Sequence, residues 1–368
     1  MPKSNKKQKI PSTRSQNKHI PTNNIPVGNC LFIGNGLNRT LKYPTQIGEI
    51  IDSASSLSWD ELLNQLATSK GVSFNKENPF PIEFERMSNE YLLKNPQIDA
   101  PYKTVTNFKK DFLELMKQLN NIPANAIHYN LISLIKEARI SAIITTNYDV
   151  IIERVLDPNF DYFKDVTKTE KPHNPKPVKV YGVDIYHAHG VLADVKTVCL
   201  GYNHYATILA CLRGEIAKKQ TNLDNSLAIR QLLTGQITEP ILKWSELFFT
   251  SNIAFIGFAL DTCEIDIWWL LTYRAYLYCG NFFQMRGLIN NKIVFYDLVI
   301  CPFDSIDFDT KSNLLVDCIS DKKKRLYDLL KCYHVEINLQ PLFQGEDYSD
   351  GYLRIIKSIN QYGIRGNQ

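Results

Sequence analysis

Two short polar segments carry side chains suited to holding an amide and moving a proton. Residues 145–149 read Thr-Thr-Asn-Tyr-Asp, where Asn147 offers a donor and an acceptor while Asp149 only accepts. Residues 187–190 read His-Ala-His-Gly, and a neutral imidazole near pH 7 is a good proton acceptor. Together these groups are able to hold a carboxamide, orient a water molecule and take up a proton.

Each of these residues also has an ordinary structural explanation. Asp149 is well placed to cap a helix that we expect to start near residue 150. We expect one of the two histidine rings to face a cleft and the other to pack. Gly190 favours His189 for the cleft, because glycine lets a backbone or a ligand come close. A His-x-His metal site needs a third ligand, and the sequence marks none.

Two further loops have the composition of ligand-binding turns. The Gly-Asn-Gly of residues 34–36 follows an apolar run, so its backbone N–H groups are candidates to surround a pyrophosphate. The full dinucleotide fingerprint needs a third glycine where Arg39 stands, so a tight turn is an equal alternative. Asp261, at the end of residues 257–261, is a candidate partner for an adenosine ribose hydroxyl or a helix cap.

The elements that must position these loops are short apolar strands alternating with helices. We predict buried strands at residues 30–33, from 140 into the polar cluster 145–149, and at 252–258, 293–299 and 335–339, with a strand-like run at 178–188. Helical spacing marks residues 59–66, 108–119, 127–138, much of 209–249 and 352–362. This alternation predicts an α/β fold with a parallel sheet and helices on both faces. Ligands bind beyond the carboxyl ends of such strands, where all four polar loops lie.

Composition and charge exclude several other classes of protein. The 368 residues are 44% hydrophobic and 22% charged, as in a globular chain, and no apolar run is long enough to predict a membrane span. Residues 1–48 hold eight basic and no acidic side chains, so the rest of this +4 chain has a net charge of −4. We therefore predict a disordered basic tail at residues 1–26 and no basic face for nucleic acid on the folded part. Whether the tail contacts nucleic acid stays open.

The eight cysteines are widely spaced, and none forms a Cys-x-x-Cys pair. A zinc ribbon is therefore not expected. The basic start is not followed by the apolar region of a signal peptide. Free thiols in a reducing cytoplasm are the simplest prediction.

Four segments occur in the order in which sirtuins carry them: Phe-Ile-Gly-Asn-Gly at 32–36, Thr-Thr-Asn-Tyr-Asp at 145–149, His-Gly at 189–190 and Ile-Gly-Phe-Ala-Leu-Asp at 256–261. With them, the chain resembles the bacterial sirtuin-like NAD hydrolases of antiphage defence over most of residues 30–360. The tryptophan-led segment 59–63 and residues 199–205, expected as a strand followed by a tyrosine, are also similar. The second and third segments are the most specific.

The resemblance implies one sirtuin-like, NAD-binding domain over residues 27–368, with a Rossmann-like core, no zinc ribbon, and a helical module inserted at about 45–138 and about 205–250. It implies Asn147 and His189 as the essential catalytic pair, with Asp149 in the nicotinamide pocket. The residues that it places against NAD are Gly34, Asn35, Gly36, Asn38, Thr146, Asp149, Gly257 and Asp261.

Two departures refine what the resemblance implies. The chain lacks the four-cysteine zinc module of deacylating sirtuins, which favours NAD cleavage over peptide deacylation. Asn35 and Asn38 stand where alanine and serine are usual, so the loop is either tighter or changes conformation when NAD binds.

The implied function is an NAD hydrolase that releases nicotinamide and ADP-ribose, uses no metal and depletes NAD during antiphage defence. Such an enzyme is toxic, so we expect restraint by assembly into a homo-oligomer or by a sensor or ATPase partner, with a HerA-like ATPase as one candidate. The alternatives are an NAD- or ADP-ribose-binding subunit of a larger complex, and a protein deacylase or ADP-ribosyltransferase.

Overall fold

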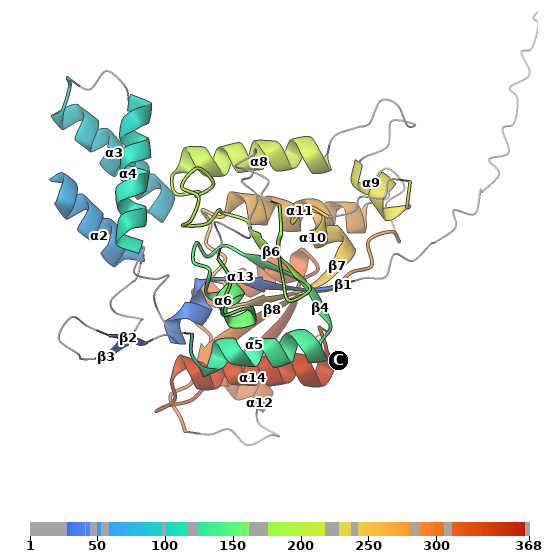
Figure 1. Cartoon of the computed structure of the whole chain (residues 1–368). Helices are drawn as coiled ribbons and strands as arrows, with labels where there is room; N and C mark the ends of the chain where they lie inside the picture. Colours follow the sequence, from blue (N-terminus) through green and yellow to red (C-terminus); the bar gives the residue numbers. More distant parts are fainter. Residues whose placement is uncertain are drawn as a thin grey trace, which may run out of the picture.

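The fold is built on a central, mostly parallel β-sheet (Figure 1). The computed structural model describes residues 28–40, 42–44, 50–52, 59–97, 101–116, 124–161, 176–217, 228–236, 242–280, 287–304 and 311–364. The expected tail at residues 1–26 lies outside these ranges. Within them, seven strands form the main sheet in the order β5-β6-β4-β1-β7-β8-β9, and β2 and β3 form a separate hairpin.

The strands of the main sheet are β1 (Gly28–Ile33), β4 (Ile140–Thr145), β5 (Val178–Val180), β6 (Val183–His187), β7 (Ser251–Ile256), β8 (Ile293–Ile300) and β9 (Glu336–Leu342), and the hairpin is β2 (Lys42–Pro44) and β3 (Ile50–Asp52). The helices are η1 (Asn35–Thr40, a 3-10 helix), α2 (Trp59–Lys70), α3 (Phe80–Lys94), α4 (Pro101–Met116), α5 (Ala126–Glu137), α6 (Ile151–Leu156), α8 (Tyr202–Ile216), α9 (Ala228–Leu233), α10 (Leu247–Thr250), α11 (Ile265–Cys279), α12 (Lys311–Asp317), α13 (Asp321–Cys332) and α14 (Tyr348–Tyr362).

Both faces of the sheet are buried, which explains the nearly continuous apolar strands. Along β1, Cys30 and Phe32 pack into a core with α8, α10 and α11, whereas Leu31 and Ile33 pack into a core with α5 and α14. Figure 1 shows α8 and α11 on one face of the sheet and α5 and α14 side by side on the other. The predicted α/β sheet with helices on both faces is confirmed.

The order of the strands reverses at β1. The chain first adds β4 and β6 on one side of β1 and later adds β7, β8 and β9 on the other. In open α/β sheets, such a reversal opens a crevice beyond the carboxyl ends of the strands, where ligands bind. A ligand-binding site is therefore expected at the carboxyl ends of the strands that flank β1.

The helices α2, α3 and α4 form a module at one end of the molecule (Figure 1). Their apolar side chains share a core with Tyr148, Ile151 and Leu192, so the module packs directly behind two of the polar loops. Within the module, α3 also contacts α8, which lies in the second helical region expected at about residues 205–250.

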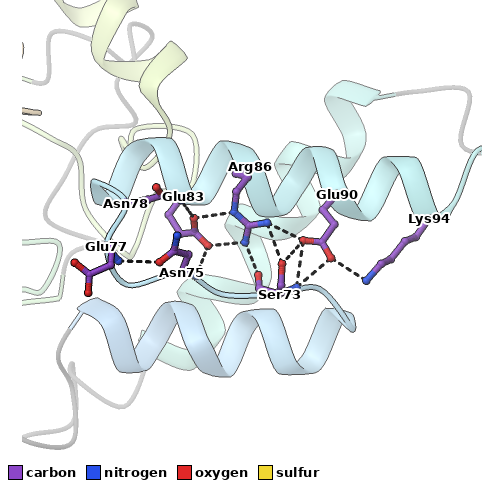
Figure 2. A network of polar contacts seen from close by, with 8 residues as sticks. All are labelled: Ser73, Asn75, Glu77, Asn78, Glu83, Arg86, Glu90 and Lys94. Atoms are coloured by element: carbon purple, nitrogen blue, oxygen red, sulfur yellow. Dashed lines mark hydrogen bonds and ion pairs between the residues drawn. The ribbon is translucent and has the colours of Figure 1, made fainter.

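An ionic network fixes the connection between α2 and α3 (Figure 2). The guanidinium of Arg86 donates to both carboxylate oxygens of the buried Glu83, at 2.8 and 2.6 Å, and to Glu90 at 2.7 Å. It also donates to the Ser73 carbonyl. Burial alone would raise the pKa of Glu83, but the hydrogen bonds from Arg86, Asn78 and the backbone lower it. This network therefore holds the connection that follows α2 against α3.

Two local expectations differ from the structure. The run 178–188 forms an antiparallel hairpin, β5 and β6, because Tyr181 and Gly182 both have positive φ and turn the chain. Residues 199–200, expected to start a strand that precedes Tyr205, do not form one, because the Cys199 N–H donates to the His189 carbonyl of a loop rather than to a neighbouring strand. In the described part of the chain, no helix is both long and apolar enough to cross a membrane.

Candidate active site

The register of the sheet brings the polar loops to one edge. Ile33 at the end of β1 pairs with Thr145 of β4 and with Ile256 of β7, and Thr145 pairs with His187 of β6. Thr145 and His187 are thus neighbours in adjacent parallel strands. Asn147 and His189 each follow their strand by two residues, so they lie on neighbouring loops. The N–H of Ala188 donates to the Thr145 carbonyl at 2.9 Å, which keeps the two loops together past the strand ends.

Asn147 is buried, and its side-chain oxygen has no hydrogen-bond partner. The backbone around it is fixed, because the Thr145 hydroxyl donates to the Ile33 carbonyl at 2.9 Å and accepts from the Asn147 N–H at 3.0 Å. Leaving a buried acceptor unpaired costs about 1–3 kcal/mol, so a hydrogen-bond donor from a ligand or from water is expected to pair with it. A ribose hydroxyl or a water molecule would satisfy it.

His189 is also buried, and it is held on two sides. Its Nε2 lies 2.9 Å from a carboxylate oxygen of Asp266, which is fully buried in the first turn of α11. The ring of Tyr205 packs edge-on against the imidazole, with 5.0 Å between the ring centres. Among the described residues, no hydrogen bond reaches Nδ1 of His189. That nitrogen is the one available to a substrate.

His187 has a structural environment. Its Nε2 lies 2.6 Å from a carboxylate oxygen of Glu153 on α6, and its Nδ1 lies 2.9 Å from the Asn147 carbonyl. Burial alone would lower the pKa of His187, but the neighbouring Glu153 carboxylate and the Asn147 carbonyl raise it. The pair ties α6 to the loop that carries Asn147.

Asp149 makes the Asx-type hydrogen bond that was the alternative to a binding role, although Val150, and not Asp149, occupies the N-cap position of α6. One carboxylate oxygen accepts from the Ile151 N–H at 3.1 Å, at the start of α6. The other accepts from Nδ2 of Asn38 at 2.9 Å, which joins this loop to η1. Burial raises the pKa of Asp149, and these two hydrogen bonds only partly oppose it. Asp149 and Asn38 are thus brought together, as their expected roles around one ligand require.

The glycine loop after β1 contacts the loop after β7. The N–H groups of Gly34 and Gly36 donate to the carbonyls of Ile256 and Gly257, at 3.0 and 2.7 Å. A side chain at Gly36 would overlap Gly257, which itself has a φ of +64°. In this conformation, the two amides hold the loops together instead of pointing at a phosphate. Asn35 lies beside them, and its side-chain oxygen accepts from Asn38 at 3.3 Å.

The remaining expected NAD contacts lie at the rim of this edge. Thr146 is half-buried, and its N–H donates to the Ile33 carbonyl at 3.4 Å. Asp261 is exposed, and its carboxylate accepts from Thr262. Glu264, not Asp261, occupies the N-cap position of α11, so the alternative role of Asp261 as a cap is not realised. The exposed carboxylate is free to meet a ligand.

Three residues of this region were not singled out in the sequence: Thr145, His128 and Asp266. Thr145 is part of the Thr-Thr-Asn-Tyr-Asp motif, but only the structure shows that its hydroxyl on β4 donates to the Ile33 carbonyl on β1. His128 of α5 lies 3.4 Å from Asn38, and Asp266 lies against His189. No local pattern marks either of them, since their partners are 90 and 77 positions away.

His128 predicts a pH dependence of stability. Burial lowers the pKa of His128 to about 4 from an ordinary value of 6.5. The unfolded chain therefore binds the proton more readily, and stability is lost as the pH falls from 6.5 towards 4. Between pH 7 and pH 5 we expect wild type to lose about 2 kcal/mol more unfolding free energy than His128→Phe. Urea titrations at the two pH values measure this, and parallel losses in both proteins would contradict it.

The fold defines an α/β protein with a candidate ligand site at the point where the strand order of its sheet reverses. Residues 141–268, roughly a third of the chain, match the family model of the SIR2-like domain. The resemblance to sirtuins is thereby confirmed over a region that holds Asn147, His189 and Asp261 but not the glycine loop after β1. A SIR2-like domain indicates a function related to NAD. A search among curated proteins found no match to the chain.

Proposed function

We propose that the protein is an NAD hydrolase that cleaves the bond between nicotinamide and ribose. The observation that carries the proposal is the buried, unpaired oxygen of Asn147, on the loop next to the one that carries His189, at the ends of adjacent strands. An acceptor and a proton-accepting imidazole at one edge match a substrate that presents hydroxyl groups. In the described residues, no cluster of three or more His, Cys, Asp or Glu side chains is arranged to hold a metal.

The proposed reaction needs the protein mainly to position the ribose and a water molecule and to accept one proton. Positively charged nicotinamide is a good leaving group and departs with the electron pair of the broken C–N bond. A water oxygen then bonds to the ribose carbon and gives up one proton. Asn147 accepts a hydrogen bond from the ribose hydroxyl or the water and so fixes its position. His189 takes the proton, and general-base help of this kind contributes on the order of 10²–10⁴-fold.

The arrangement of the other residues suits the same ligand. Asn38 is hydrogen-bonded to Asp149, which follows β4 on one side of β1. Gly257 and Asp261 follow β7, which lies on the other side of β1. We therefore place the nicotinamide ribose between Asn147 and His189, and the adenosine half towards Asp261. The contact between Gly36 and Gly257 must open for the glycine loop to bind phosphates through these amides.

Product analysis tests the function directly. We expect the purified full-length protein, alone or once activated, to convert NAD into equal amounts of nicotinamide and ADP-ribose without any acylated peptide. Separation of the products by chromatography with mass detection measures both. Nicotinamide release that requires an acylated peptide would point to a deacylase, and tight calorimetric binding of NAD without cleavage, both with and without a partner protein, would point to a binding subunit. Either result would contradict hydrolysis.

We also propose that the activity is restrained in a cytoplasmic setting, as an effector of antiphage defence. The basis is the toxicity of NAD loss and the resemblance to defence proteins, together with eight cysteines that are all free thiols. A homo-oligomer, or an ATPase or sensor partner such as a HerA-like ATPase, would provide the switch. Light scattering after size exclusion measures self-assembly, and a monodisperse monomer would contradict the homo-oligomer.

A further inference from the structure

Asp266 is buried against the residue proposed to take up the proton. The carboxylate is fully buried and His189 is 2% exposed, with 2.9 Å between Oδ2 and Nε2. The two residues come from different crossovers of the sheet, since His189 follows β6 and Asp266 lies on α11 after β7. Their contact thus spans the candidate site from one side of β1 to the other.

The chemistry of this contact selects one form of the imidazole. A neutral histidine carries a hydrogen on only one ring nitrogen, whereas an ionised carboxylate can only accept. Asp266 therefore keeps the hydrogen on Nε2 and leaves the lone pair on Nδ1. No described residue hydrogen-bonds Nδ1, so that lone pair is available to a ligand.

The surroundings of His189 contact both its ring and its backbone. The Tyr205 ring packs edge-on against the imidazole, and the His189 carbonyl accepts from the Cys199 N–H at 2.8 Å. Gly190 allows this arrangement, because its φ is +91° and a side chain there would overlap the Thr197 carbonyl. With backbone and ring both held, the hydrogen bond to Asp266 decides which ring nitrogen is left for a ligand.

We propose that Asp266 is a positioning residue that holds His189 in its Nε2–H form, so that Nδ1 is the atom that accepts the proton. This inference rests on the proposed hydrolase function and names the acting atom of the same site. Asp266 itself does not touch the substrate in this role. Its other oxygen, Oδ1, is buried and has no hydrogen-bond partner. Among the described residues, His189 is therefore the one hydrogen-bond partner of this carboxylate.

Nitrogen NMR of the full-length protein tests the positioning without relying on activity. With ¹⁵N-labelled histidine, the His189 signals are those that disappear in His189→Gln. We expect a hydrogen-bearing Nε2 and a bare Nδ1 in wild type, and loss of this single form in Asp266→Asn, whose amide can donate as well as accept. A hydrogen on Nδ1 of wild-type His189 would overturn the proposal, even if Asp266→Asn failed to fold.

Kinetics supply the second measurement. We expect Asp266→Asn to lower kcat by about 10²–10⁴-fold with little change in KM, because the amide keeps the shape but not the fixed tautomer. Asp328→Asn, at an exposed acid on α13, is the matched control and should retain wild-type kcat. An unchanged kcat in Asp266→Asn would overturn the proposal. A wild type that never cleaves NAD would instead contradict the hydrolase function, and the spectrum would still decide the role of Asp266.

Discussion

Replacing Asn147 with alanine is expected to lower nicotinamide release by on the order of 10²–10⁴-fold while leaving the fold as stable as before. The reason is the unusual position of its side chain, which is buried but makes no hydrogen bond within the described structure. Removing it therefore breaks no side-chain hydrogen bond and takes away an unpaired acceptor, which offsets the packing that is lost. A residue that matters for turnover and not for stability is a residue of the site.

His189→Gln is the companion variant. Glutamine keeps an N–H donor for Asp266, so it avoids leaving a buried carboxylate unpaired, but it cannot accept and release a proton near neutral pH. We expect a loss of the same order in kcat. Asn64→Ala and His334→Ala, both at exposed positions, are matched controls for the two replacements. Nicotinamide release and thermal unfolding are measured for all four, and undiminished turnover in both site variants would remove the mechanism.

Breaking the pair of His187 and Glu153 is expected to have the largest effect on stability. Both side chains are almost completely buried, with 2.6 Å between the imidazole and the carboxylate. His187→Ala leaves the Glu153 carboxylate without its partner, and losing one member of a buried pair typically costs about 3–5 kcal/mol. Denaturant unfolding measures the loss. Lys179→Ala, which breaks the exposed ion pair with Asp184 on the neighbouring hairpin, should cost less than about 1 kcal/mol.

The pH dependence of this effect has a defined sign. Because the pKa of His187 is raised in the folded protein, its contribution to stability is complete below the ordinary histidine value and declines as the pH rises through the folded value. The advantage of wild type over His187→Ala should therefore shrink towards alkaline pH. An advantage that grew with pH, or a loss no larger than that of Lys179→Ala, would contradict the assignment. His128, with its lowered pKa, acts in the opposite direction.

The strands were predictable because each is apolar on both faces. The runs at 30–33, 252–258 and 293–299 correspond to β1, β7 and β8, whose side chains alternate between two buried cores. The hairpin within 178–188 was less visible, because it depends on two positive φ angles at Tyr181 and Gly182. Tyrosine seldom adopts such a conformation, so its residue type predicted no turn.

Residues 199–205 are a second case in which the sequence pattern was not enough. The apolar residues of this segment predicted a strand, but they pack into the cores with the helical module and with α8. The hydroxyl of Tyr148 donates to the Cys199 carbonyl, and the Cys199 N–H donates to His189. A short apolar run becomes a strand only where a neighbouring strand is free to pair with it, and this is a property of the whole fold.

The sequence was enough to predict which loops are candidates to carry the chemistry, because the change from an apolar strand to a polar turn is local and occurs in consecutive residues. The tertiary structure alone decided the partners of those loops. His189 meets Asp266 across 77 positions, and Asn38 meets Asp149 across 111. It also engaged the amides of Gly34 and Gly36 with β7. These pairings depend on strand order, register and helix packing, which bring distant residues together irrespective of any local pattern.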